Sequence, residues 1–228
     1  SKGTDANFSW RERKIKNWPK TSDNNIVSAA PDNADWLSED HRIIGATRVN
    51  NVLWFAWTAA TGDGGGGGFK FPQPHVQIAK FDLGQDYKLI EQTQVWNADH
   101  AYAYPSLTTN SDNEVGISLA WGGNASLQYY GNHAVGILGD FVVWFGEASD
   151  ITLLRQKVDP TTLKLVFDSK GNPVMDETRW GDYVHVRLAH PDTRFFSAFG
   201  YAVRDDSTKI AAPNIGRFDY LYVEFGRE

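Results

Sequence analysis

The sequence predicts an all-β protein, specifically a β-propeller of four-stranded antiparallel blades. Helical periodicity is absent, because no window of about 11 residues places apolar side chains three and four positions apart. Aromatic residues, which favour strands, make up 14% of the chain, and its 21 glycines suit many tight turns. A layout of strand, turn and strand also recurs three times along the chain.

Three units share this layout, and each is expected to continue into further strands. The first starts at Asp40 and has expected strands at 42–49, 52–60, 76–81 and 87–96. The second starts at Asp99 and has expected strands at 102–107, 115–121, 134–138 and 141–145. The third starts at Arg179 and has expected strands at 184–188, 195–201, 209–212 and 220–225. Turn-forming residues follow the first strand of each unit, at 50–51, 110–113 and 190–193.

The repeat divides the chain into a leading segment and three blades. Residues 1–36 are predicted to include the outer strand of a preceding blade, and the blades cover about 37–98, 99–178 and 179–228. Propellers close with roughly four to eight blades, so three leave two open sheet edges and an exposed core face. We therefore expect a partial propeller, completed by another segment of a longer protein or by a partner chain. A β-sandwich is the alternative architecture.

Charge and hydropathy exclude several classes of partner. The formal net charge is −6 with no basic block, which argues against nucleic-acid binding because that requires a basic face. No run approaches the roughly 18 apolar residues that span a bilayer, so no membrane partner is expected. The chain has no cysteine, which excludes disulfides and thiolate metal sites.

Two segments of the chain carry distinctive motifs, a Tyr-Pro-Ser-Leu strand at 104–107 and an Arg-Trp-Gly-Asp-Tyr motif at 179–183. With these motifs the chain resembles a bacterial family of secreted, sialidase-like propellers of the BNR type. The resemblance implies a propeller fold and a location that is secreted or at the cell surface. The chain departs from sialidases because it has no intact Asp box (Ser-x-Asp-x-Gly-x-Thr-Trp). The arginine triad, the acid/base Asp and the Tyr–Glu pair of those enzymes do not map onto it either.

Three polar clusters, each just before the innermost strand of a unit, are the candidate ligand-binding residues. They are Asp40, His41 and Arg42; Asp99, His100 and Tyr102; and Arg179, Trp180, Asp182 and Tyr183. In a propeller this position lies near the mouth of the central channel, so the clusters are expected to converge. Arg can hold a carboxylate or sulfate, Asp and His can exchange protons, and aromatic rings can stack on sugars. The alternative is that these side chains bond to backbone groups and hold neighbouring blades together.

The sequence predicts a binding or interaction module that recognises a glycan, a polymer or a protein through its central face. The alternatives are a sialidase-like glycoside hydrolase with part of its active site outside this chain, and a structural assembly protein. Whether the protein is an enzyme stays open, and no catalytic residue is assigned. No cofactor is expected, except that calcium is left open for the Asp-rich loops at 32–35 and 111–114.

Overall fold

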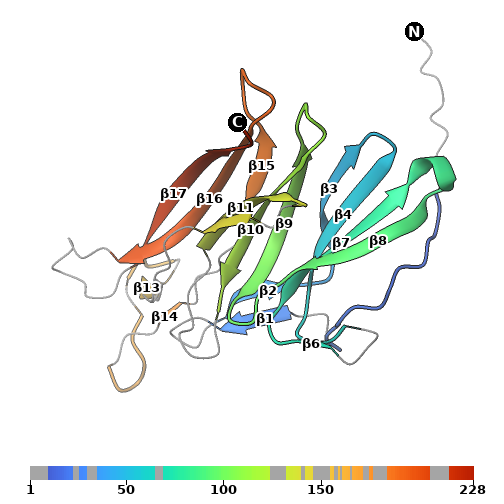
Figure 1. The fold of residues 1–228 in the computed structure, drawn as a ribbon. Helices are drawn as coiled ribbons and strands as arrows, with labels where there is room; N and C mark the ends of the chain where they lie inside the picture. The colour runs from blue at the N-terminus through green and yellow to red at the C-terminus, as the bar shows by residue number, and fades with distance from the viewer. Residues whose placement is uncertain are drawn as a thin grey trace, which may run out of the picture.

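A computed structural model describes most of the chain. The described residues are 10–22, 26–29, 35–64, 69–123, 132–139, 142–145, 155–156, 159, 161–164, 166–171, 175–176, 184–205 and 216–228. They form several small antiparallel sheets, and the prediction of an all-β chain is confirmed. Within these ranges there is no α-helix, and the only helical turn is a short 3₁₀ segment, Leu83–Gln85. The described strands do not close into a ring (Figure 1).

The first sheet is a four-stranded meander in which each strand pairs with its neighbours in sequence. Its strands are β3 (Ile43–Val49), β4 (Val52–Ala59), β7 (His75–Asp82) and β8 (Lys88–Val95). The predicted turn between β3 and β4 is a two-residue connection at which Asn50 adopts a left-handed φ of 50°. Asn tolerates this conformation better than most residues, which explains its place in the turn. Two short strands, β5 (Gly62–Asp63) and β6 (Lys70–Phe71), pair with each other between β4 and β7.

The second and third sheets repeat this meander order. The second contains β9 (Ala101–Thr109), β10 (Val115–Gly122), β11 (Asn132–Leu138) and β12 (Val142–Phe145). The third contains β15 (His185–Leu188), β16 (Phe196–Asp205) and β17 (Gly216–Phe225). The strand predicted at 209–212, between β16 and β17 in sequence, lies outside the described residues, and β17 pairs directly with β16. Between the second and third sheets in sequence, β13 (Arg155–Gln156) and β14 (Met175–Asp176) pair with each other.

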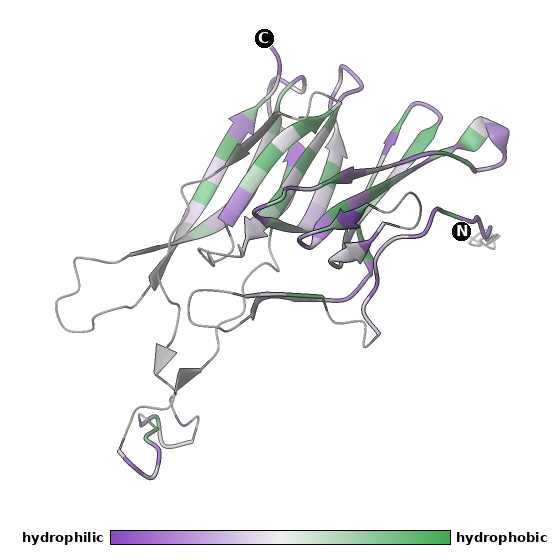
Figure 2. Cartoon of the chain, turned by 60° about the horizontal axis from the view of Figure 1, so that its bottom comes forward, coloured by the Kyte–Doolittle hydropathy of each residue, from purple (hydrophilic) through white to green (hydrophobic). Residues whose placement is uncertain are grey.

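The second sheet packs between the other two, and alternation along its strands supplies a different set of side chains to each face. Val115, Ile117 and Leu119 of β10 belong to the cluster shared with the first sheet. Gly116, the residue between two of these, faces the third sheet, where an added Cβ would lie 2.6 Å from the ring of Phe196. The alternation of hydrophobic and hydrophilic residues that produces two distinct faces is visible along the strands in Figure 2.

A second close approach joins the same two sheets. A Cβ added to Gly200 of β16 would lie 2.3 Å from the ring of His133, which is fully buried on β11. Only a residue without a side chain fits there, so glycine lets the imidazole fill the space between the sheets. These two contacts fix how the second and third sheets are spaced.

A hairpin of β1 (Ile26–Ala29) and β2 (Asp35–Glu39) lies across one end of the second sheet (Figure 1). Its buried Ile26, Trp36 and Leu37 form a cluster with small residues at the ends of β9 and β10. Trp36 and Leu37 are among the largest fully buried side chains of the described chain. The hairpin is therefore held by apolar packing rather than by pairing with a main sheet.

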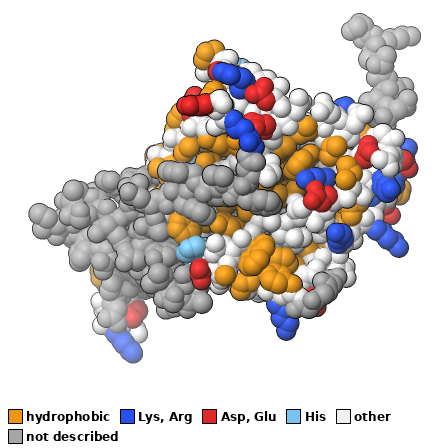
Figure 3. Space-filling model, viewed as in Figure 1, with side chains coloured by type: hydrophobic (Ala, Val, Ile, Leu, Met, Phe, Trp, Pro, Cys, Tyr) orange, Lys and Arg blue, Asp and Glu red, His pale blue; other side chains and the backbone are white. Residues whose placement is uncertain are grey.

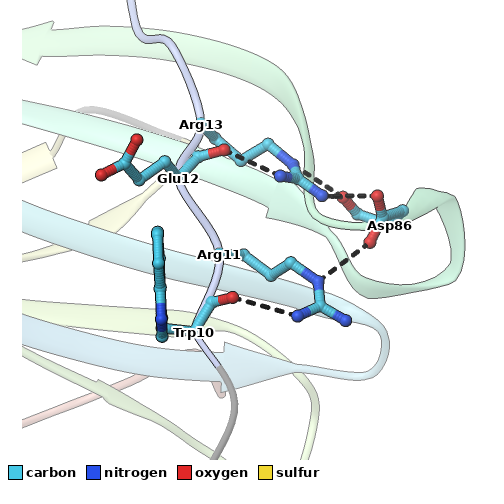
Figure 4. Close-up of polar contacts among 5 residues, drawn as sticks. All are labelled: Trp10, Arg11, Glu12, Arg13 and Asp86. Carbon is cyan, nitrogen blue, oxygen red and sulfur yellow. Dashed lines mark hydrogen bonds and ion pairs between the residues drawn. The ribbon is translucent and has the colours of Figure 1, made fainter.

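The N-terminal segment, residues 10–20, forms no strand and lies along the outer face of the first sheet. Arg13 donates hydrogen bonds to the backbone and side-chain oxygens of Asp86, and Arg11 pairs with the same carboxylate at 3.6 Å (Figure 4). Farther along, the ring of Trp18 meets that of Trp57 edge-on, with centroids 5.3 Å apart. These contacts hold the segment on the sheet at both ends.

Candidate functional site

The first strands of the three main sheets meet around a cavity. The cavity has a volume of about 400 Å³ and lies between β3, β9 and β15, with β9 in the middle. Its polar lining includes the side chains of Arg42, Ser106 and His185. Three segments that lie far apart in sequence thus contribute to one concave site, and ligand-binding sites are usually concave.

A β-bulge at the same relative place in β3 and β9 shapes the wall of this cavity. The register shifts between Ile43 and Gly45 in β3, and opposite Ser118–Ala120 in β9. In β9 the bulge places Tyr104 in the left-handed region, with a φ of 53°, and its backbone N–H donates to Thr58 Oγ1 at 3.2 Å. Bulges often lie next to functional sites because they interrupt strand pairing and redirect side chains.

Gly45 explains how closely the two bulged strands approach each other. A Cβ at this position would lie 2.8 Å from the carbonyl oxygen of Pro105 and 3.3 Å from Leu107. A side chain would therefore push β3 away from β9 and change the shape of the cavity between them.

Ser106 and His185 form the contact between the second and third sheets inside the cavity. Ser106 Oγ lies 3.3 Å from His185 Nδ1 and accepts a hydrogen bond from the backbone N–H of Val186, also at 3.3 Å. Partial desolvation and the nearby charge of Arg187 lower the pKa of His185 below 6.5. The imidazole is therefore neutral at pH 7, with one nitrogen that donates a hydrogen bond and one that accepts.

The first predicted cluster contributes Arg42 to the cavity. Asp40 Oδ1 accepts hydrogen bonds from the backbone N–H of Arg42 at 2.9 Å and from its Nε at 2.6 Å. Desolvation acts to raise the pKa of Asp40, but these hydrogen bonds and the positive charge outweigh it and lower the pKa. His41 does not line the cavity. Its Nε2 accepts a hydrogen bond from the backbone N–H of Thr21 at 3.2 Å.

The second predicted cluster lies at the start of β9, outside the cavity lining. Asp99 is exposed in the turn before the strand. His100 packs edge-on against Trp121, with centroids 4.8 Å apart. Tyr102 is buried in the cluster between the first two sheets, and this burial raises its pKa to about 12. The ring of Tyr102 therefore belongs to the core.

The third predicted cluster, Arg179, Trp180, Asp182 and Tyr183, lies outside the described residues. The described chain resumes at Val184, which lines the cavity beside His185. Tyr104, Ser106 and His185 were not predicted as site residues. The sequence contains two signals for them: the Tyr-Pro-Ser-Leu stretch at 104–107, and the alternation of His185 and Arg187 with apolar residues.

One of the two acidic loops considered for calcium contains a carboxylate that already interacts within the protein. In the loop at 111–114, the carboxylate of Glu114 accepts a hydrogen bond from Asn110 Nδ2 at 2.8 Å and pairs with Arg227. Residues 32–34 of the other loop lie outside the described residues. Across the part of the chain that the structure describes, no three His, Asp or Glu side chains come together as a metal site.

Comparison of the chain with protein-family models, with curated proteins and with solved structures finds no match. No described helix is long and apolar enough to cross a membrane.

Proposed function

We propose that the three main sheets are consecutive blades of an open, β-propeller-like ring. The meander order within each sheet supports this proposal, as does the position of β9 between β3 and β15. In a propeller the first strand of every blade lies nearest the axis, so the cavity would sit at the central face. The ring would be completed by further sheets, either from a longer form of this protein or from a partner chain.

We further propose that the protein is an exported, non-enzymatic binding module that recognises a glycan through this central face. The observation that carries the proposal is the set of hydrogen-bonding groups in the cavity: Arg42, Ser106 and the neutral imidazole of His185. Sugar hydroxyls both donate and accept hydrogen bonds, and so do a serine hydroxyl and a neutral histidine. The arginine supplies further donors, which bind hydroxyl oxygens and, more strongly, carboxylate oxygens.

Glycan-array binding, followed by calorimetry on the best ligand, tests this function. Arg42→Ala should weaken binding at least tenfold because it removes a guanidinium donor from the cavity wall. Arg194→Ala is a matched control: Arg194 pairs with Asp192 two residues earlier, as Arg42 does with Asp40, but it lies outside the cavity. Equal binding by wild type and Arg42→Ala would refute the assignment of the site.

The same protein tested against fluorogenic glycosides distinguishes binding from hydrolysis. Wild type is expected to release no product at any pH between 4 and 8. Product release that is lost in Asp182→Asn would replace the binding function with the hydrolase alternative and would assign a catalytic role to the third predicted cluster.

A structural role in assembly is the second candidate function, because both outer faces of the sheet array expose large apolar side chains. On the first sheet, Ile43 is 59% exposed. On the third sheet, Phe199 is 53% exposed and Tyr220 is 88% exposed. Figure 3 shows hydrophobic side chains across the middle of one side of the molecule, with charged side chains toward its upper and right-hand loops.

A further inference from the structure

We infer that the two outer faces bind each other in a second copy of this chain, so that two copies close one ring of six sheets. The inference rests on the proposed open ring and names the chain that completes it. Its evidence is separate from the central cavity, and it comes from how the sheets already pack on one another.

The outer face of the first sheet matches, position by position, a face that is buried in the second. Ala56 of β4 pairs with Gly45, and Ser118 of β10 pairs with Ser106. Gly45 and Ser106 each follow a bulge, so β4 and β10 can be aligned with Ala56 at the position of Ser118. On this alignment Leu53, Phe55 and Trp57 of β4 correspond to Val115, Ile117 and Leu119 of β10. Leu53 and Phe55 are partly exposed, whereas Trp57 is already buried against Trp18 of the N-terminal segment. The β10 residues are fully buried because the preceding sheet covers them.

This outer face is also hollowed. A groove of about 410 Å³ lies between the N-terminal segment and the sheet, and it is lined by Leu53, Phe55, Trp57 and Phe81 with Ile15 of the segment. Arg11 and Arg13 border it and are held by Asp86. An apolar groove of this size can accept the aromatic side chains of a facing sheet.

The outer face of the third sheet presents such side chains. Phe199 of β16 and Tyr222 of β17 are directly paired across the strands, and their ring centroids are 5.1 Å apart. Tyr220, on the same face, is 88% exposed. The opposite face of this sheet, with Phe196 and Ala198, is buried against the second sheet.

The packing within the chain indicates which faces belong together. The first sheet packs on the second and the second packs on the third, and in each contact the face that points toward the later sheet meets the face that points toward the earlier one. A further contact of the same kind would join the outer face of the third sheet to the outer face of the first. Two copies joined in this way would contain six sheets, within the roughly four to eight with which propellers close. Such a head-to-tail contact gives a ring when the rotation closes.

The mass in solution is the first test, measured by sedimentation equilibrium on the full chain. Wild type is expected at twice the monomer mass of 25.5 kDa. Tyr222→Asp should give monomers, because it places a charge in the apolar interface. Leu163→Asp is the matched control, since Leu163 is a similarly exposed apolar residue that lies on neither face. A wild type that stays monomeric at micromolar concentrations would overturn the inference and assign the faces to other sheets.

Cross-linking identifies the faces directly, because the wild-type chain has no cysteine to interfere. A mixture of Phe55→Cys and Phe199→Cys proteins should form a disulfide-linked pair on mild oxidation. A mixture of Phe55→Cys and Lys88→Cys should not, because Lys88 lies at an exposed strand end. A dimer that cross-links in neither mixture would refute the face-to-face contact. Loss of glycan binding with retention of the dimer would remove the proposed function and leave this inference standing.

Discussion

Two buried histidines should make the protein lose stability in mildly acidic solution. His75 and His133 are fully buried, and desolvation lowers the pKa of each imidazole from 6.5 to about 4. His75 stacks on Phe71 with centroids 3.8 Å apart, and His133 Nε2 lies 2.7 Å from Ser118 Oγ. In the unfolded chain each imidazole would bind a proton at its ordinary pKa.

The sign and size of the effect follow from these pKa values. Because the folded pKa lies below the unfolded one, the unfolded state binds more protons between about pH 6.5 and pH 4, so stability falls as the pH falls. Each histidine should contribute a loss of about 2 kcal/mol between pH 7 and pH 5, and the two together about 4 kcal/mol. Below about pH 4 both states are protonated and this loss levels off.

Urea unfolding at several pH values between 7 and 5 measures the effect. His133→Gln should lower the dependence of the unfolding free energy on pH by about 1 kcal/mol per pH unit near pH 5. A wild-type stability that is flat over this range, or a His133→Gln protein with the wild-type slope, would refute the reasoning.

Three further predictions concern the core. Gly200→Ala should destabilise the protein by about 1–3 kcal/mol in thermal or urea unfolding, because the new methyl group would overlap the ring of His133; an unchanged midpoint would contradict this contact. Phe196→Ala should cost about 3–5 kcal/mol, whereas Leu163→Ala, at an exposed apolar residue outside the main sheets, should change the unfolding free energy by less than about 0.5 kcal/mol; equal effects would contradict the burial of Phe196. Ultraviolet titration should show a tyrosine that ionises only near pH 12, and Tyr102→Phe should remove that late step.

Local sequence patterns were sufficient to predict most strands of the three main sheets and the turn between β3 and β4. They did not predict the β1–β2 hairpin or the short β5–β6 pair. The turn at Asn50-Asn51 needs a left-handed residue, and asparagine in that place is visible in the sequence. The alternation along β10 likewise indicates a strand with two different faces. The first strand of each unit pairs with the strand that follows it in sequence, so each forms a hairpin whose strands and turn are visible in one short stretch of sequence.

The cavity could not be predicted because it depends on where bulges interrupt the alternation. Tyr102 and Tyr104 are two residues apart and would share a face in a regular strand. The bulge in β9 breaks this rule: Tyr102 enters the core between the first two sheets, and Tyr104 packs toward the β1–β2 hairpin and lines the cavity. A non-glycine residue with a positive φ leaves no sequence signal here. The meeting of Ser106 with His185 depends on how separate sheets pack, which no local pattern records.

Because every main sheet is made from one continuous stretch of chain, most strand pairing closes only short loops. The entropy lost in closing a loop grows slowly with its length, but it must be overcome before distant contacts form. Each meander can therefore assemble early, with docking of the finished sheets as the later step. In the monomer, partial opening should follow the same lines. Among the described residues the third sheet packs on one other main sheet and the middle sheet packs on two, so the third sheet should separate as a unit and exchange its amide hydrogens first.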